Sequence, residues 1–532
     1  MLKRSHEGCI DVKRDSKLKS ILSSATKKLK DQDNHTSETL SNDIQKNKEK
    51  LKKQFGPSED VIFRQLNIPF DDDTAQDTLL VFVDGMVDEN AVRNNIINAL
   101  ITQPLKLQRG GDKLEKVKSK VSIFNTVTNE TDIEKAVFEI LQGSAFLLVE
   151  GYDQGLLMNV AGFELRSPEE PETERMVRGA RDGFIESIST NMALLRRRIP
   201  HTSLQFETIK IGKYSQTQIA IAYVKDITDP KLVERIKLRL HQINVDAIEN
   251  SGEIEQSIED HPFSIFPTIG NTGRPDKASA LLMEGRVILI VDGDPCILYA
   301  PYLCLESIQS LEDYTSRPYY TSFIRIIRFV SFLISILFPA LYIAVLNFHK
   351  VMIPSEMVVP LIQARETVPF PLAMEIIIII LMFETVREAG IRLPQQVGSA
   401  LSIVGALIFG QVAVSAGIMG APTTVVVSIS YIASFINSSI SGVISLLRIG
   451  LFIAASLFGG YGLIMAMLGL LTHMVSLTSI GIPYMAPFAP FYFRDWNDTL
   501  IRFPYRWLKQ RPKSIPNKRP KKIESLPKTG DK

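Results

Sequence analysis

Cysteine is almost absent from this chain of 532 residues. The three that occur, Cys9, Cys296 and Cys304, form no CxxC pair and no even framework. This argues against an exported domain held together by disulfides. The N-terminus is basic but has no apolar stretch behind it, so no cleaved signal peptide is predicted. We expect the soluble part of the chain in a reducing compartment.

Motifs for enzyme chemistry are also lacking. Seven scattered histidines give no metal spacing such as HExxH, and the sequence contains neither a GxxxxGK[ST] phosphate loop nor a GxSxG elbow. We therefore expect no enzyme, no metal site and no cofactor.

Charge is missing from one long stretch. Charged residues make up 22% of the chain, yet Arg448 is the only one in the 101 residues from Leu393 to Phe493. A soluble core of that length would show charged faces, whereas each charge at the centre of a bilayer costs roughly 2.5 to 3.5 kcal/mol on insertion scales. The stretch therefore belongs in a membrane, and the chain reads as a soluble part followed by a membrane part.

The soluble part is predicted to be α+β, a mixed α/β region of two subdomains, 59–200 and 201–320. After Asp77 a short apolar run, an Asp-Gly turn and a 3.6-residue apolar period predict strand, turn and helix. Hairpins are predicted over 146–160 and 203–225, and another strand pair follows a helix near Pro275. The recurring pieces VFVDG, LLVEG and LIVDG hint at two similar subdomains.

Both ends of the chain are basic. Residues 1–55 hold fourteen Lys or Arg against eight acids, and residues 494–532 hold twelve against four. Residues 1–58 carry few large apolar side chains and are predicted to be a disordered basic tether. Contact with anionic lipid and a merely solvated arm both remain open for this tether. Residues 494–532 are predicted to be a basic cytoplasmic tail.

Residues 321–493 are predicted to form a helical, polytopic transmembrane domain. The first span runs from Phe329 to Phe348, and Pro339 inside it requires neighbouring helices to satisfy the freed carbonyl. Arginines before this span place the soluble part in the cytoplasm. A second span follows from Leu372, and a third runs from Val397 to Met419.

Small residues recur every three or four positions in the third span, which predicts a face for close helix packing. They are Gly398, Ser402, Ala406, Gly410, Ala413 and Gly417.

The next apolar run, 423–447, is interrupted at Asn437-Ser438-Ser439. It is either one kinked span or a re-entrant hairpin. Because a further full span would leave the basic tail outside, we expect four full spans, the last from Ile449 to Leu477, plus this broken segment. Both termini are then cytoplasmic.

Polar residues within the spans are the candidates for function. Glu375 is an intramembrane acid, which is a functional hypothesis by default, although a position at the outer interface is an equal alternative. Gln411 and Ser415 could line an aqueous path or bond a neighbouring helix, and Asn437 has the same two interpretations. If the broken segment is re-entrant, Arg448 lies near the outer start of the last span or inside the assembly, and if that segment crosses fully, Arg448 marks a cytoplasmic turn. The run Arg196–Arg198 is more simply a solvated helix end than a nucleic-acid contact.

Several long segments resemble one family. They are VDGMVDEN near Asp84, RGARDGFIESISTNMALLRRRI from Arg178, RPDKASALLMEGRVILIVDGDP from Arg274, the membrane block from Arg365 to Ile418, and IGIPYMAPFAP. Over about residues 77–495 the chain resembles the A subunits of GerA-type spore germinant receptors.

The resemblance implies a nutrient-sensing complex in the inner membrane of the bacterial spore. Its other members would be a transporter-like B subunit and a lipoprotein C subunit, with membrane lipid around them and no nucleic acid. It also implies a homo-oligomer that forms or gates an ion channel to start germination. A paralogous A-like protein of the spore dipicolinate channel system is the near alternative. A secondary transporter, which would need paired broken helices, is the alternative from another class.

Overall fold

The computed structural model describes residues 38–522, apart from 72–74, 103, 106–111, 122–126, 163–173, 175, 177 and 393–410. The described chain forms two compact units. The first holds the residues up to 167 together with Ser189–Glu207, and the second holds those of Pro168–Ile188 and everything from Thr208 onward.

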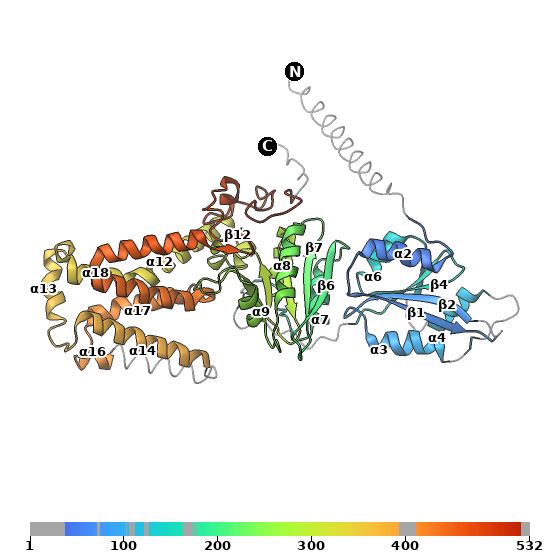
Figure 1. Cartoon of the computed structure of the whole chain (residues 1–532), viewed down its shortest axis with the longest axis horizontal. Coiled ribbons are helices and arrows are strands. Elements are labelled where there is room, and N and C mark those ends of the chain that lie inside the picture. The colour runs from blue at the N-terminus through green and yellow to red at the C-terminus, as the bar shows by residue number, and fades with distance from the viewer. Residues whose placement is uncertain are drawn as a thin grey trace, which may run out of the picture. The chain divides into compact units, whose positions relative to one another are not determined.

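A five-stranded sheet forms the centre of the first unit. Its strands are β1 (Val61–Pro69), β2 (Ala75–Val83), β3 (Val127–Glu130), β4 (Ser144–Val149) and β5 (Gly155–Asn159), in the order β1-β2-β4-β5-β3, with antiparallel neighbours. Strands β2 and β4 are buried on both faces, because helices cover each side of the sheet (Figure 1). One side carries α2 (Ile44–Phe55) and α6 (Ile133–Ile140), whose apolar cluster also contains Ala193 of α7 (Ile188–Arg198). The other side carries α3 (Glu89–Ala91), η1 (Val92–Asn98), α4 (Ala99–Ile101) and α5 (Lys113–Val121).

Helix α2 corrects the predicted extent of the N-terminal tether. Asp43 caps the helix through the backbone N–H groups of Gln45 and Lys46, and Ile44, Leu51 and Phe55 are buried in the core. Apolar residues at this spacing line one face of a helix even where the surrounding composition is polar. Residues 38–58 therefore belong to the folded unit. The remainder of the expected tether, 1–37, lies outside the described residues.

The second unit repeats this strand order. Its sheet contains β6 (Leu204–Ile211), β7 (Thr217–Val224), β8 (Gly270–Thr272), β9 (Val287–Val291) and β10 (Ile297–Ala300), in the order β6-β7-β9-β10-β8. The pieces LLVEG and LIVDG occupy equivalent places, since Gly151 follows β4 and Gly293 follows β9. Both glycines have positive φ, 88° and 87°. The mixed α/β region is thus built from two sheets of one topology.

Segments from the end of the chain complete the second sheet's core. The second unit also contains helices α8 (Pro230–Gln242), α9 (Ser251–Ile258) and α10 (Pro275–Glu284). Its apolar cluster also contains Ile480, Ile482 and Ile515. Asn517 forms a β-bridge with Thr228, and the buried Arg511 donates to the Met283 carbonyl. The described part of the expected tail, 494–522, is therefore docked on the sheet.

The second unit also contains a group of apolar helices (Figure 1). They are α12 (Pro318–Phe348), α13 (Ser355–Gln363), α14 (Leu372–Arg392), α16 (Ala413–Ser415), α17 (Ala421–Phe435) and α18 (Ser441–Ser476), with short 3₁₀ turns at Lys350–Met352 and Ser438–Ile440. Among the described residues, two helical stretches, Pro318–Phe348 and Ser438–Ser476, are long and apolar enough to cross a membrane.

Helix α18 reverses direction at Gly459. A straight helix of its 36 residues would be about 54 Å long. However, Gly459 has φ 61° and ψ −144°, and a Cβ placed on Gly462 would lie 2.3 Å from the Ala454 carbonyl oxygen. The expected single span from Ile449 to Leu477 is therefore divided. Its first half runs toward Phe348 at the end of α12, and its second half returns toward the sheet, where His473 lies 3.1 Å from Ser264.

A buried arginine fastens the end of α7 in the first unit. The guanidinium of Arg196 donates to both carboxylate oxygens of Asp60, at 3.0 and 2.7 Å, and to the carbonyls of His201 and Leu204. The side chains of Arg196 and Asp60 are 1% and 0% exposed. Arg196 is thus an internal clamp, which is neither of the interpretations offered for the arginine run.

We predict that Arg196→Met loosens the first unit. It leaves Asp60 charged and unpaired in the core, and breaking a buried pair typically costs 3–5 kcal/mol. Hydrogen exchange of β1 and α7 in the full-length protein should accelerate accordingly. Arg197→Met at the exposed neighbouring position should change stability by less than about 0.5 kcal/mol. Equal exchange in the two variants would contradict the clamp.

We also predict that Gly459→Ala destabilises the helical part. The φ/ψ region of Gly459 is essentially restricted to glycine and costs other residues about 1–3 kcal/mol. The added Cβ would also lie 2.7 Å from the Phe348 ring. The thermal midpoint of the purified protein in detergent should fall. Gly469→Ala is the matched control, because a Cβ there meets no atom within 4 Å. A midpoint equal to that of this control would refute the reversal.

Candidate functional site

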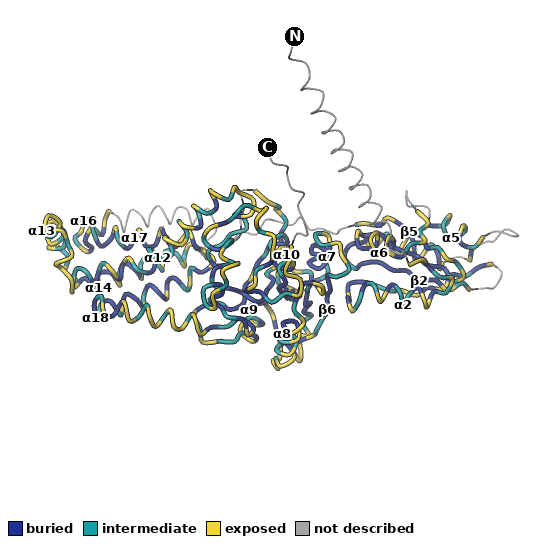
Figure 2. Tube along the Cα trace, turned by 90° about the horizontal axis from the view of Figure 1, so that it is seen from above, coloured by how far each residue is buried: buried dark blue, intermediate teal, exposed yellow. Residues whose placement is uncertain are grey.

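Several charged side chains of the helical part are buried, whereas many of its exposed side chains are apolar. Arg448 and Glu375 are each 1% exposed, but Leu457, Ile464 and Leu468 are all more than half exposed. Figure 2 shows buried and exposed residues alternating along α14 and α18. This pattern suits an apolar surrounding and requires the buried charges to find partners within the protein.

The first partner of Arg448 is a backbone carbonyl that has lost its helical hydrogen bond because of a proline. Pro339 in α12 has no N–H, so the carbonyl four residues earlier, at Ser335, loses its helical hydrogen bond. Two groups from other helices replace it. The Ser430 hydroxyl of α17 and Nε of Arg448 in α18 both donate to the Ser335 oxygen at 2.9 Å. The requirement that Pro339 places on its neighbours is met at this point.

An aromatic ring and a carboxylate complete the surroundings of Arg448. Its guanidinium carbon lies 3.8 Å from the centroid of the Tyr431 ring, within the range of a cation–π contact. Nη1 makes no hydrogen bond and lies 3.8 Å from Oε1 of Glu384. The Tyr431 hydroxyl donates to the same oxygen at 2.9 Å. Arg448 therefore lies inside the bundle and not at a turn.

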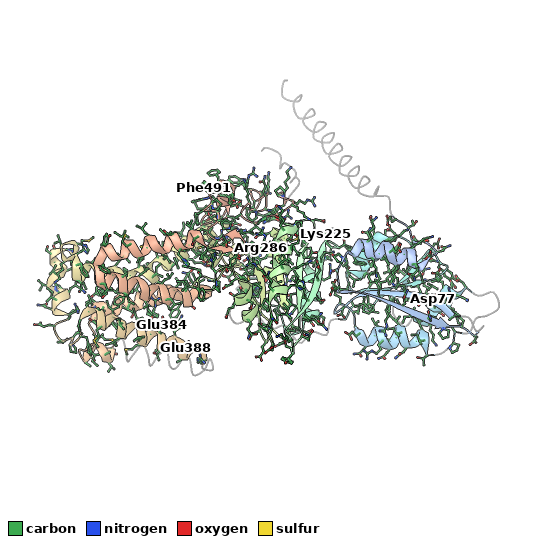
Figure 3. The ribbon with its side chains drawn as sticks, in the orientation of Figure 1. Asp77, Lys225, Arg286, Glu384, Glu388 and Phe491 are labelled. Atoms are coloured by element: carbon green, nitrogen blue, oxygen red, sulfur yellow. The ribbon has the colours of Figure 1, made fainter. Side chains whose placement is uncertain are left out.

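Glu384 of α14 is shared by several groups. Besides Tyr431 and Arg448, it pairs with Arg387 through its other oxygen at 2.6 Å. Figure 3 labels Glu384 and, one turn further along α14, Glu388, which is exposed and pairs with Arg392. One carboxylate thus faces two arginines. We call Ser335, Ser430, Tyr431, Glu384 and Arg448 the proline-linked cluster.

Glu375 forms a second, separate pair. Its Oε1 accepts the backbone N–H of Gly420, the residue that precedes α17, at 2.8 Å. Its Oε2 has no hydrogen bond and lies 3.5 Å from Nε of Arg365. Glu375 therefore joins the beginnings of α14 and α17 inside one chain. A functional role for this intramembrane acid remains a prediction.

The two polar candidates of the third predicted span, Gln411 and Ser415, are not buried as Arg448 and Glu375 are. Gln411 and Ser415 are both exposed, and the Ser415 hydroxyl bonds only its own helix, at the Val412 carbonyl. Gly417 has φ 67° and packs on Thr367. The packing positions Gly398, Ser402, Ala406 and Gly410 lie outside the described residues.

Asn437 lies at the break between α17 and α18, where the sequence predicted an interruption. It is buried, and its Nδ2 donates to the Arg328 carbonyl near the beginning of α12 at 3.1 Å. The beginning of α18 is therefore level with Arg328, at the sheet end of the bundle.

A third charged cluster joins α12 to the C-terminal segment. Arg325 donates to Asp313 at 2.8 Å and to Asp498 at 2.9 Å, and Arg328 also pairs with Asp313. Burial raises the pKa of Asp498, although the charge of Arg325 acts in the opposite direction. The first turns of α12 are thus tied to residues that follow the last helix.

Within the described residues, no group of three or more His, Cys, Asp or Glu side chains is arranged to hold a metal ion. Burial raises the pKa of the Cys296 thiol to about 11, which disfavours its reactive thiolate. The inward charges serve to hold helices together and to present a polar interior.

Sequence reasoning missed Ser335, Ser430 and Tyr431 and gave Glu384 little weight. A usable signal existed for Ser335, because a proline within a helix identifies the freed carbonyl by counting back four residues. No such rule identifies which distant side chains will bond it.

Comparisons with known proteins identify the family of the chain. Residues 49–514 match the profile of the Bacillus/Clostridium GerA spore germination protein family. The chain is 39% identical over 478 residues to spore germination protein KA of Bacillus subtilis (strain 168), covering 90% of this chain and 87% of that protein. It is 34% identical over 447 residues to spore germination protein A1 of the same organism, covering 84% and 91%.

A solved structure is also similar in sequence. The N-terminal domain of the A subunit of the Bacillus megaterium spore germinant receptor GerK3 is 30% identical, with a TM-score of 0.40, and the match covers 51% of this chain and 98% of that one. The family match and the two full-length relatives carry the assignment. The chain belongs to the GerA family of spore germination proteins.

Proposed function

We propose that the chain is the integral-membrane A subunit of a nutrient-sensing germinant receptor, and that copies of it form or gate an ion channel. The observation that carries this proposal is the contrast among its polar residues. Arg448, Glu375 and Glu384 are paired within one chain, whereas Gln411 and Ser415 are exposed on it. Paired charges stabilise a subunit, and exposed polar groups in a span need water or another subunit.

The proposed topology has six crossings. Helix α12 leaves the sheet end, and α14 and α17 both return toward it, because Glu375 lies beside Gly420 while Glu384 lies beside Tyr431. The two halves of α18 add an outward and a return crossing. The third span, predicted over 397–419, remains a prediction and supplies the outward crossing between α14 and α17. Both termini then lie on the cytoplasmic side.

The remaining parts of the proposal follow from family membership and the earlier resemblance. The receptor would contain a transporter-like B subunit and a lipoprotein C subunit in the inner spore membrane, and this chain would act without catalysis. The relatives named as spore germination proteins favour this role over that of a transporter. An A-like accessory protein of the dipicolinate channel system is the remaining alternative, and B- and C-type genes in the same operon would favour the receptor.

We predict that the exposed polar positions control conduction. Gln411→Cys and Ser415→Cys, made in a variant without the native cysteines, should react with a cationic thiol reagent that cannot cross lipid. Ion flux through the protein reconstituted in liposomes should then fall several-fold, because a fixed positive charge in a narrow polar path repels cations.

Leu457→Cys is the matched control, since Leu457 is 64% exposed on an apolar surface. The reagent should leave flux through that variant unchanged. Flux that is unaffected by reaction at both polar positions would contradict a path lined by them. An absence of flux from the unmodified protein and its receptor partners would contradict the channel itself.

A further inference from the structure

Exposed aromatic side chains gather at the sheet end of the helical part. They come from three segments that are far apart in sequence: the first turns of α12, the loop before β8, and the chain that follows the last helix. We call them the aromatic collar: Phe263, Tyr319, Tyr320, Phe323, Phe491, Phe493, Trp496, Tyr505 and Trp507. Phe263 is completely exposed, and Tyr319 and Phe493 are more than 80% exposed.

Hydrogen bonds and an ion pair fix all three segments at the same end of the bundle. The backbone N–H of Arg502 donates to the Ser322 hydroxyl of α12 at 3.0 Å, and Asp498 pairs with Arg325. The loop that contains Phe263 is held by Ser264, which lies 3.1 Å from His473 near the end of α18. From Ser322 to Phe329, where the charge-free run begins, a helix rises only about 10 Å. The collar therefore surrounds the point where the apolar helices begin.

The collar's tryptophans are held in ordered positions. The ring of Trp496 lies 5.2 Å from that of Phe488 and 5.4 Å from that of Phe491, which Figure 3 labels. The ring of Trp507 lies 5.7 Å from that of Phe503. Trp507 is nevertheless 66% exposed. These rings are thus supported from behind while a large apolar surface remains open.

The C-terminal segment of the collar is rich in cationic side chains. Residues 494–522 contain ten Lys or Arg against two Asp. Both acids are used internally: Asp498 pairs with Arg325, and Asp495 accepts the backbone N–H groups of Lys513 and Ser514 at 2.9 and 2.7 Å. Arg494 and Lys509 are exposed. The outward charge is therefore cationic.

We propose that the aromatic collar lies in the headgroup layer of an anionic membrane and anchors the subunit there. Amphipathic tyrosine and tryptophan rings favour this layer, and lysine and arginine beside it are attracted to acidic lipid. The inference rests on the proposed membrane crossings and adds a lipid-binding surface to them. A second copy is a poor occupant, because a symmetric contact through this cationic face would place like charges opposite one another.

The chain provides its own probe for this proposal. It contains two tryptophans, Trp496 and Trp507, and both belong to the collar. Tryptophan emission of the full-length protein in lipid nanodiscs therefore reports on the collar alone. We expect emission shifted to the blue, strong quenching by lipids brominated near the headgroup end of the acyl chain, and weaker quenching by lipids brominated near its end. Trp496→Phe and Trp507→Phe assign the signal to each position.

Two results would overturn the proposal. Emission typical of water, quenched by acrylamide and insensitive to brominated lipid, would place the collar in solvent. Blue emission that is insensitive to brominated lipid would show that protein covers it. Retention of the protein in the discs after alkaline washing tests the membrane crossings separately, so failure of the collar and failure of the proposed function are distinguishable.

Acidic headgroups are tested with mixed discs of phosphatidylglycerol and phosphatidylcholine in which one lipid is brominated. Quenching by the brominated acidic lipid should exceed quenching by the brominated zwitterionic lipid. The double variant Arg494→Gln and Lys509→Gln should lose most of that preference while its emission remains blue. Equal quenching by both lipids in the unmodified protein would refute the anionic preference.

Discussion

A proline without an N–H is the constraint around which the helical part is arranged. Pro339 leaves the Ser335 carbonyl unbonded within an apolar layer, where an unsatisfied backbone group costs several kcal/mol. Ser430 and Arg448 supply the missing donors and so join α12, α17 and α18 at one oxygen. Because Arg448 brings a buried charge, the cluster also needs the ring of Tyr431 and the carboxylate of Glu384. One lost backbone hydrogen bond thus connects four helices.

The soluble and helical parts are interleaved and are not two proteins joined end to end. The reversal at Gly459 returns the chain to the second sheet, where Ile480, Ile482 and Ile515 enter its core. Arg325 and Asp498 then tie the beginning of the first long helix to the segment after the last one. The second sheet and both ends of the helical part are therefore joined by contacts within one unit.

Sequence patterns predicted the features that depend on local chemistry. Alternation and turn residues predicted the mixed α/β region, and the pieces LLVEG and LIVDG predicted the repeated topology. The polar interruption around Asn437 and the demand created by Pro339 could also be read from the sequence. The partners of the Ser335 carbonyl could not be read from the sequence, because Ser430 and Arg448 lie about one hundred positions away from it. The reversal at Gly459 was missed because an apolar run of this length is equally compatible with one long helix or two shorter ones. Helix α2 was missed because composition was given more weight than the spacing of Ile44, Leu51 and Phe55.

The central claim is that Arg448 is held by the carbonyl that Pro339 frees. A double-mutant cycle in the thermal stability of the purified protein tests it, using Pro339→Ala, Arg448→Met and their combination. Alanine at position 339 restores an N–H that can bond Ser335, so the effect of Arg448→Met should depend on which residue occupies position 339. We expect a coupling free energy of about 1 kcal/mol or more between the two sites. Effects that add to within about 0.5 kcal/mol would contradict it.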